Sequence, residues 1–192
     1  MMAAMNVNAQ NGEDYLKHEI GISYGVFSNS TWMSIGDDMG SAIASVGAFT
    51  YDDSKFIGPI GLEYFYHISP VVGLGAIGVY ANETKDMLLR NNKYGEAKNT
   101  YITVMPAAKF NWLRKKYFGL YSKVAAGVCF RSQKEDYRVT DNPPHHDSKN
   151  KVLFNFHVTG IGLEAGSPYL RGFLECGVGE QGIFAAGVRA KF

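Results

Sequence analysis

The sequence predicts an all-β protein, an eight-stranded antiparallel up-and-down transmembrane β-barrel. Apolar residues alternate with polar or small residues with a period of two along most of the chain. The alternating segments are about ten residues long, which lets a strand tilted by ~45° cross an apolar band of ~25 Å. Charges in the middle of these segments fall on one face only. The eight segments are 16–27, 58–68, 71–81, 101–112, 117–131, 151–159, 169–178 and 183–192.

Six of the eight segments have a clear apolar face, and 169–178 has a weaker one. In chain order, these faces carry Ile20, Ile22 and Tyr24; Leu62, Tyr64 and Ile68; Ile102, Val104 and Phe110; Val124, Val128 and Phe130; Val152, Phe154 and Val158; Leu170, Leu174 and Val178; and Phe184, Val188 and Phe192. In 71–81 both faces are apolar or Gly, so the pattern does not fix its phase. We expect the apolar faces to meet lipid and the mixed faces to fill the lumen.

The mid-strand charges determine which face is which. Seven of them share the face opposite the apolar one: Glu19, Glu63, Lys109, Lys123, Arg171, Glu175 and Arg189. A register shift of one residue would place all seven in lipid. The free-energy cost would be roughly 2–4 kcal/mol for each Arg or Lys at the midplane. Because side chains fill an eight-stranded barrel and unpaired buried charges are costly, we expect a structural lumen network of ion pairs. The alternative is a conducting pore lined by charges.

The composition excludes several other classes of protein. Apolar residues make up 46% and charged residues 19% of the 192 residues, and no apolar run approaches the ~18–20 residues of a transmembrane helix. A formal net charge of +1 leaves no electrostatic case for nucleic-acid binding. The two cysteines, Cys129 and Cys176, cannot form a disulfide framework, and their segments are not neighbours in the predicted barrel, so we expect free thiols.

The N-terminus resembles the end of a secretory signal. Val7 and Ala9 are small residues at the spacing of a signal-peptidase site, and Gln10 follows them. We expect 1–9 to be a residual signal-peptide tail and 10–192 to be the barrel domain. The alternative is an ordinary disordered N-terminus.

The connections are predicted to differ between the two ends of the barrel. Short turns at 69–70, 114–116 and 166–168 alternate with long segments at 28–55, 82–99 and 132–150, as in outer-membrane barrels. We expect the long segments to be extracellular loops that bind any surface ligand, the first with a short helix over the barrel mouth. Aromatic girdles are expected at both ends: Tyr64, Tyr66, Phe110, Trp112, Phe118 and Tyr169 near the short turns, and Tyr24, Phe27, Tyr80, Phe130 and Phe154 near the long segments.

The C-terminal residues carry a resemblance. The chain ends Gly187-Val-Arg-Ala-Lys-Phe192, and together with residues 173–187 this looks like the last hairpin of small outer-membrane β-barrel domain proteins of Bacteroidetes. The resemblance implies an OmpA/OmpX-type barrel in the bacterial outer membrane, with Phe192 as its membrane-insertion signal. It further implies outer-membrane lipid, lipopolysaccharide and the outer-membrane assembly machinery as partners. It brings no catalytic motif.

Two groups of residues are candidates for metal binding or catalysis. His145, His146 and Asp147 are metal-ligand types, but a third or fourth ligand is not evident. His67 and Ser69 have the His-x-Ser spacing of lipid A deacylases, but they lie at the short-turn end and their neighbours do not match that family. We therefore predict no enzyme, no metal and no cofactor.

The sequence thus favours a monomeric integral outer-membrane protein with a structural or surface-interaction role, not a conducting porin. A lipid-modifying enzyme and a soluble lipocalin-like binder remain as alternatives. The direction of the seven charges distinguishes a lipocalin from a membrane barrel. A lipocalin has an apolar interior and a polar exterior, so its charges would face outward.

Overall fold

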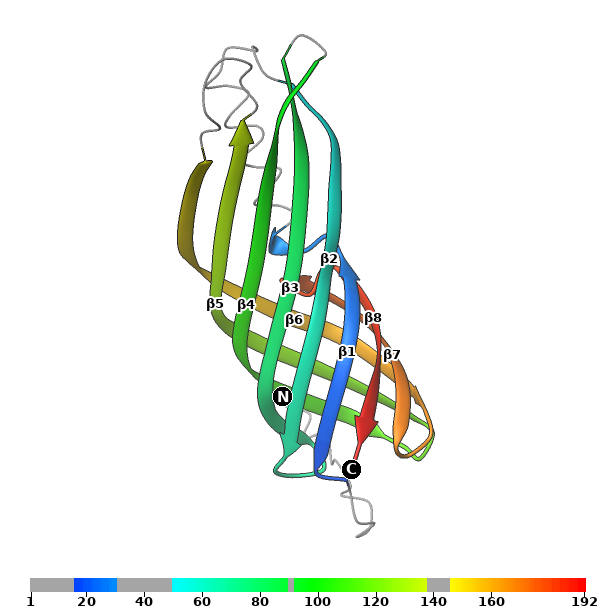
Figure 1. Ribbon diagram of the computed structural model, residues 1–192. Helices are drawn as coiled ribbons and strands as arrows, with labels where there is room; N and C mark the ends of the chain where they lie inside the picture. Colours follow the sequence, from blue (N-terminus) through cyan, green and yellow to red (C-terminus); the bar gives the residue numbers. More distant parts are fainter. Residues whose placement is uncertain (1–15, 31–49, 90–91, 138–145) are drawn as a thin grey trace, which may run out of the picture.

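The chain forms one closed barrel of eight antiparallel strands, each paired with the next and β8 paired with β1. The computed structural model describes residues 16–30, 50–89, 92–137 and 146–192 (Figure 1). The strands are β1 His18–Val26, β2 Thr50–His67, β3 Val72–Leu89, β4 Asn92–Arg114, β5 Phe118–Tyr137, β6 His146–Gly166, β7 Leu170–Gly179 and β8 Phe184–Lys191. No helix in these ranges is long and apolar enough to cross a membrane. The predicted fold class is confirmed.

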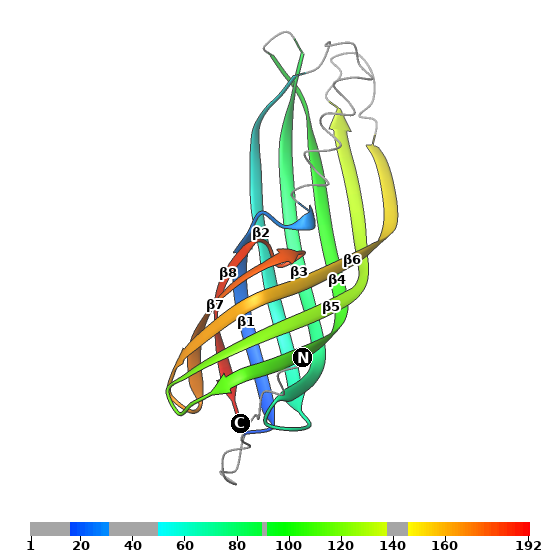
Figure 2. The same ribbon diagram turned by 180° about the vertical axis from the view of Figure 1, so that it is seen from behind.

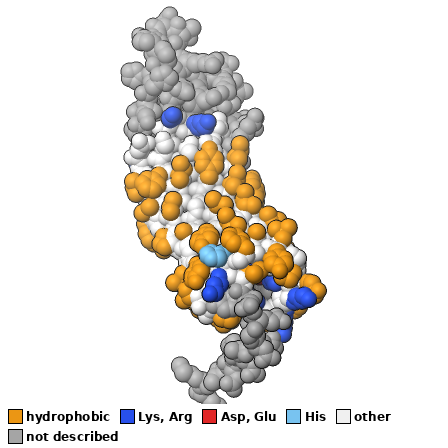
Figure 3. Space-filling model, turned by 60° about the horizontal axis from the view of Figure 1, so that its bottom comes forward, with side chains coloured by type: hydrophobic (Ala, Val, Ile, Leu, Met, Phe, Trp, Pro, Cys, Tyr) orange, Lys and Arg blue, Asp and Glu red, His pale blue; other side chains and the backbone are white. Residues whose placement is uncertain are grey.

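The alternation of the sequence appears directly as an alternation of burial. On β2, Leu62 is 59% exposed while its neighbour Glu63 is 1% exposed. On the face seen in Figure 3, apolar side chains cover the middle of the barrel, and basic ones lie near its two ends. The apolar wall faces outward and the ionic groups face inward, which is the reverse of a lipocalin.

Five strands are much longer than the ten residues predicted. Strands β2 to β6 have 18 to 23 residues and rise well beyond the ends of β1, β7 and β8 (Figures 1 and 2). The predicted loops 82–99 and 132–150 are therefore mostly strand. Polar residues such as Asn82 and Glu83 have low β-propensity, but ladder pairing with Thr100 and Asn99 continues the sheet past the apolar band. The predicted helix over the mouth falls largely on 31–49, outside the described residues.

Strand β6 is longer than predicted because it contains a β-bulge. The pairing of β6 with β7 shifts between Thr159 and Ile161, which leaves Gly160 as an extra residue. The alternation therefore changes phase, and β6 continues to Gly166 instead of ending at 159. Beyond the bulge Ile161 faces outward and Glu164 faces inward.

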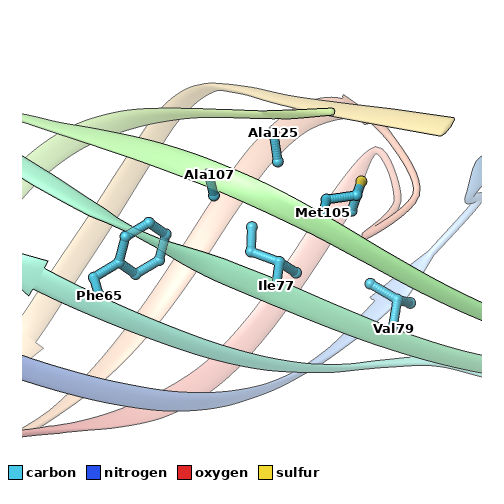
Figure 4. Close-up of a cluster of buried hydrophobic side chains, with 6 residues drawn as sticks. All are labelled: Phe65, Ile77, Val79, Met105, Ala107 and Ala125. Atoms are coloured by element: carbon cyan, nitrogen blue, oxygen red, sulfur yellow. The ribbon is translucent and has the colours of Figure 1, made fainter. Parts of the chain in front are cut away.

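The inner wall combines a small apolar cluster with glycines opposite large side chains. Phe65, Ile77, Val79, Met105, Ala107 and Ala125 line the inner faces of β2 to β5 (Figure 4). Elsewhere Phe173 faces Gly187 and His67 faces Gly73 across neighbouring strands. An eight-stranded barrel is narrow, so these small residues provide room for the large ones.

Candidate functional site

The candidate site is the ionic network inside the barrel. All seven charged residues selected from the sequence have buried side chains there, each at most 4% exposed. They come from six of the barrel's eight strands, because alternation directs each of them to the same side of the closed sheet: Glu19, Glu63, Lys109, Lys123, Arg171, Glu175 and Arg189. The structure brings them together into one connected group.

Arg189 lies at the centre of the network. Its guanidinium contacts Glu63 at 2.5 Å, Glu19 at 3.3 Å and Glu175 at 3.4 Å. The same group also lies over the rings of Phe173 and Tyr121, at 4.0 and 4.6 Å from their centroids. A planar guanidinium with five donors can serve several carboxylates at once, which a lysine ammonium does less well.

Two lysines complete the pairing on the β4–β5 side. Lys109 Nζ lies 2.6 Å from Glu19, and Lys123 Nζ lies 2.6 Å from Glu63 and 2.9 Å from Glu175. Each of these carboxylates therefore has at least two cationic partners. Buried charges paired in this way avoid the several kcal/mol that an uncompensated buried ion costs.

Glu164, Lys191 and Tyr121 also belong to the network, and sequence reasoning did not select them. Glu164 contacts Arg189 at 2.9 Å, Arg171 at 2.7 Å and Lys109 at 3.5 Å, and it also pairs with Lys191. The bulge at Gly160 hid Glu164, because an unbroken alternation from Val158 would place residue 164 in lipid. The other two are Lys191, at the end of β8, and Tyr121, whose hydroxyl donates to Glu175 at 2.5 Å. Their inward phase was readable from the sequence.

Arg171 connects the network to the short-turn end of the barrel. Its guanidinium donates to the carbonyls of Lys115 and Lys116 at 2.9 and 3.0 Å, and its Nε donates to the Ser167 carbonyl at 3.2 Å. One side chain thus ties Glu164 to two neighbouring turns. Hydrogen bonds and ion pairs therefore cross the lumen at this end of the barrel.

A second polar group lies at the opposite mouth. The carboxylate of Glu180, fully buried, accepts hydrogen bonds from the Ser30 backbone N–H at 3.2 Å, the Thr103 hydroxyl at 3.1 Å and the Asn155 amide at 2.7 Å. The Ser30 hydroxyl also binds this carboxylate. The segment that follows β1 is therefore fastened into the mouth of the barrel.

The outer wall carries the two predicted aromatic girdles. All eleven aromatic residues named for them are exposed in the structure, between 39% for Tyr66 and Phe110 and 71% for Phe154. At the seam between β1 and β8, the ring of Phe192 stacks on His18, with centroids 5.5 Å apart. His18 lies on the apolar face of its strand, and its Nδ1 lies 2.8 Å from the Tyr64 hydroxyl.

His67 and Ser69 do not lie together in a catalytic pair. His67 Nε2 contacts Glu19 at 3.2 Å inside the lumen, while the Ser69 hydroxyl accepts from the Val72 N–H in the turn. Cys129 is buried and Cys176 is exposed, and both are free thiols. The side chains of His145, His146 and Asp147 lie outside those that the structure describes. Among the described residues, no three His, Cys, Asp or Glu side chains are placed to hold a metal ion.

The outer and inner walls together define a transmembrane barrel. In a closed sheet, the backbone N–H and C=O groups of every strand are hydrogen-bonded to neighbouring strands, as the lipid interior requires. The exterior is apolar and matches the hydrocarbon, and the ionic groups are enclosed in the lumen. This architecture places the chain in a bacterial outer membrane. The described ends of the chain meet at the short-turn end, where His18 and Phe192 exchange backbone hydrogen bonds of 2.8 and 2.9 Å. In outer-membrane barrels the short turns lie on the periplasmic side and the long connections lie on the extracellular side.

Comparisons with known proteins add two solved structures. No protein-family model and no curated protein matches the sequence. One similar structure is Ail, the attachment invasion locus protein of Yersinia pestis, with 15% identity, coverage of 93% of this chain and 99% of that chain, and a TM-score of 0.48. Another is Ail in complex with the heparin analogue sucrose octasulfate, with 14% identity, coverage of 92% and 100%, and a TM-score of 0.49.

Proposed function

We propose that the chain is a non-conducting outer-membrane protein that interacts with its surroundings through the extracellular ends of β2 to β6. The observation that carries this proposal is the extension of these five strands beyond the closed part of the barrel (Figure 2). Building such a sheet above the bilayer serves no purpose for membrane insertion alone. It offers a rigid surface for contacts outside the cell.

The extended sheet is open, with an unpaired edge on each side in the described part of the chain. β1 pairs with β2 only as far as Tyr24 opposite Ile60, so Thr50–Ile57 has a strand on the β3 side alone. β7 pairs with β6 only as far as Gly179 opposite His157, so 146–156 has a strand on the β5 side alone. Free strand edges are common sites of partner binding.

The absence of conduction is supported by the position of Arg189 and its partners. The group joins strands from all around the barrel, through contacts of 2.5 to 3.4 Å. Planar-bilayer recording of the refolded protein should give no stable openings. Ohmic openings of constant size would support the charge-lined pore instead.

The surface role is tested by shortening the extended hairpins while keeping their register. Asn82 pairs with Thr100, and Ser132 pairs with Asn150, just above the closed part of the barrel. Replacing 83–99 and 133–149 each by Asn-Gly removes most of the extended strands and closes both hairpins with two-residue turns. Cells with the full chain should differ from cells lacking it in adhesion to host cells or in survival in serum, and the trimmed variant should lose this difference. A trimmed variant that folds and keeps the full effect would contradict the proposal.

Phe192 is proposed as the signal read by the outer-membrane assembly machinery. The competing role is purely structural, because its ring stacks on His18 at the barrel seam. Phe192→Ala should lower assembly in cells but leave spontaneous refolding into vesicles unchanged. Equal losses in both assays would indicate seam closure alone.

We also propose that 1–9 is removed on export, which N-terminal sequencing of the native protein would test.

A further inference from the structure

The connection between β7 and β8, residues 179–182, is buried inside the barrel. All four of its residues are buried, with Glu180 at 0% and Gln181 at 1% exposure. Connecting segments normally run over the protein surface, because a buried one carries backbone polar groups that need partners. The contacts of this turn therefore show what it does in the lumen.

Glu180 binds the turn to β4 and β6. Its carboxylate accepts hydrogen bonds from the Thr103 hydroxyl of β4 at 3.1 Å and from the Asn155 amide of β6 at 2.7 Å. Its backbone N–H donates to the Phe156 carbonyl of β6 at 3.0 Å. The turn is thus held at both its side chain and its backbone.

Gln181 binds the turn to β6 and β1. Its backbone N–H donates to Nδ1 of His157 on β6 at 3.3 Å, and its side-chain amide lies 3.5 Å from the Ser23 hydroxyl on β1. Strands β1, β4 and β6 are not neighbours in the barrel. The turn therefore spans the mouth of the lumen.

Two inward glycines make room for Gln181. A Cβ atom on Gly25 of β1 would lie 1.8 Å from the Gln181 carbonyl oxygen, and one on Gly61 of β2 would lie 2.8 Å from the Gln181 amide nitrogen. The contact at Gly25 is with backbone, so a larger residue there cannot coexist with the turn in this position. Two strands of the barrel are therefore fitted to the inserted turn.

We propose that the turn 179–182 is a plug that closes the extracellular mouth, and that the ionic network around Arg189 is a second closure below it. This inference deepens the proposed non-conducting role and rests on it. His157 Nε2 lies 3.0 Å from the Thr159 hydroxyl, which donates to Glu175 of the network at 3.2 Å. Hydrogen bonds thus join the two closures. Release of the plug alone should admit solutes to the upper lumen without opening a path through the barrel.

The test measures access to the lumen by cysteine labelling. The reporter is Ala125→Cys in a C129A/C176A background of the refolded full chain in lipid nanodiscs. Ala125 is buried on the inner wall (Figure 4), and its register partner on β6 is His157, which contacts the turn. Modification of this cysteine by a charged, water-soluble thiol reagent is followed by mass spectrometry. It should be slow while the turn is in place.

Two variants release the plug by different means. E180A/Q181A removes its side-chain hydrogen bonds, and Gly25→Ala expels the Gln181 carbonyl while leaving those side chains intact. Each should raise the labelling rate about tenfold, the scale expected when hydrogen bonds to a charged group are lost. Gly78→Ala on β3 is the matched control and should not change the rate, because the nearest atom to a Cβ there is 3.9 Å away. Heat-modifiable migration on gels identifies the variants that fold.

Planar-bilayer recording separates the two closures. Both release variants should remain without stable openings, because Arg189 and its partners are unchanged. An unchanged labelling rate in the folded release variants, or an equal increase in Gly78→Ala, would overturn the plug. Ohmic openings in the release variants alone would overturn the second closure. Openings of the wild-type chain would instead contradict the proposed function on which the inference rests.

Discussion

The ring of Tyr121 lies directly against the backbone of Gly162, its register partner on β6. A Cβ atom on residue 162 would come within 2.4 Å of the ring carbon that carries the hydroxyl. That hydroxyl is fixed by its hydrogen bond to Glu175, and the ring also lies under Lys109 and Arg189. The glycine thus makes space for the side chain that organises part of the network.

Gly162→Ala should therefore destabilise the barrel, because the ring cannot move without disturbing Glu175. We expect a loss of about 1–3 kcal/mol, the usual cost of overpacking. The measurement is the free energy of unfolding in denaturant from lipid vesicles. Gly160→Ala is the control, since the nearest atom to a Cβ there is 3.8 Å away. Equal stabilities for the two variants would contradict this account of the packing.

Arg189→Met should be among the most damaging substitutions in the lumen. It leaves Glu19, Glu63 and Glu175 without their shared partner, and breaking a buried ion pair typically costs about 3–5 kcal/mol. Arg189→Lys should lose less, and R189M/E63Q should recover part of the loss. Unfolding free energies report all three. Lys116→Met, on an exposed turn, is the matched control, and a comparable loss in that variant would argue against a structural network.

Deletion of Gly160 should leave the barrel able to assemble. It removes the extra residue of the bulge, so that Thr159 is followed directly by Ile161, and Ile161 and Leu163 still face lipid while Glu164 still faces the lumen. Deletion of Leu163 shifts the phase instead, and places either Glu164 in lipid or Ile161 in the lumen. The heat-modifiable band of a folded barrel should remain on gels for the first variant and disappear for the second. Loss of the band in the Gly160 deletion would show that the bulge is needed for more than the spacing of β6.

Glu180→Ala should release the segment that enters the mouth of the barrel. The Ser30 N–H loses its acceptor, so its hydrogen exchange should accelerate, while amides in the middle of β4 should be unaffected. Glu180→Gln keeps an oxygen acceptor and should have a smaller effect. Unchanged exchange at Ser30 in Glu180→Ala would mean that other contacts hold the segment.

Most of the barrel could be predicted from the sequence, because lipid imposes one rule on every strand. Leu62 beside Glu63, or Val188 beside Arg189, can be assigned to the two faces without any tertiary information. The same rule places the inner charges, since a closed sheet has only one interior. The alternation is a physical requirement, so it is visible in the order of the residues.

Two features could not be predicted, for identifiable reasons. Glu164 is hidden because one extra residue at Gly160 changes the phase of β6, and a bulge has no signal in periodicity beyond the glycine itself. The sequence predicts loops where the strands extend, because residues such as Asn82, Glu83 and Thr84 are common in solvent-exposed loops. Pairing to Thr100, Asn99 and Lys98 decides their conformation, and pairing partners are distant in sequence.

The central claim is that apolar side chains face lipid while charged ones are enclosed. Nitroxide accessibility tests it most directly, in a C129A/C176A background refolded into vesicles, with single labels at Leu62, at Ala107 and at Lys116. The label at Leu62 should collide strongly with dissolved oxygen and weakly with a water-soluble nickel complex. The label at Ala107 should collide with neither reagent. The label at Lys116 should collide strongly with the nickel complex. A Leu62 label as accessible to nickel as the one at Lys116 would contradict the assignment of this wall to the membrane.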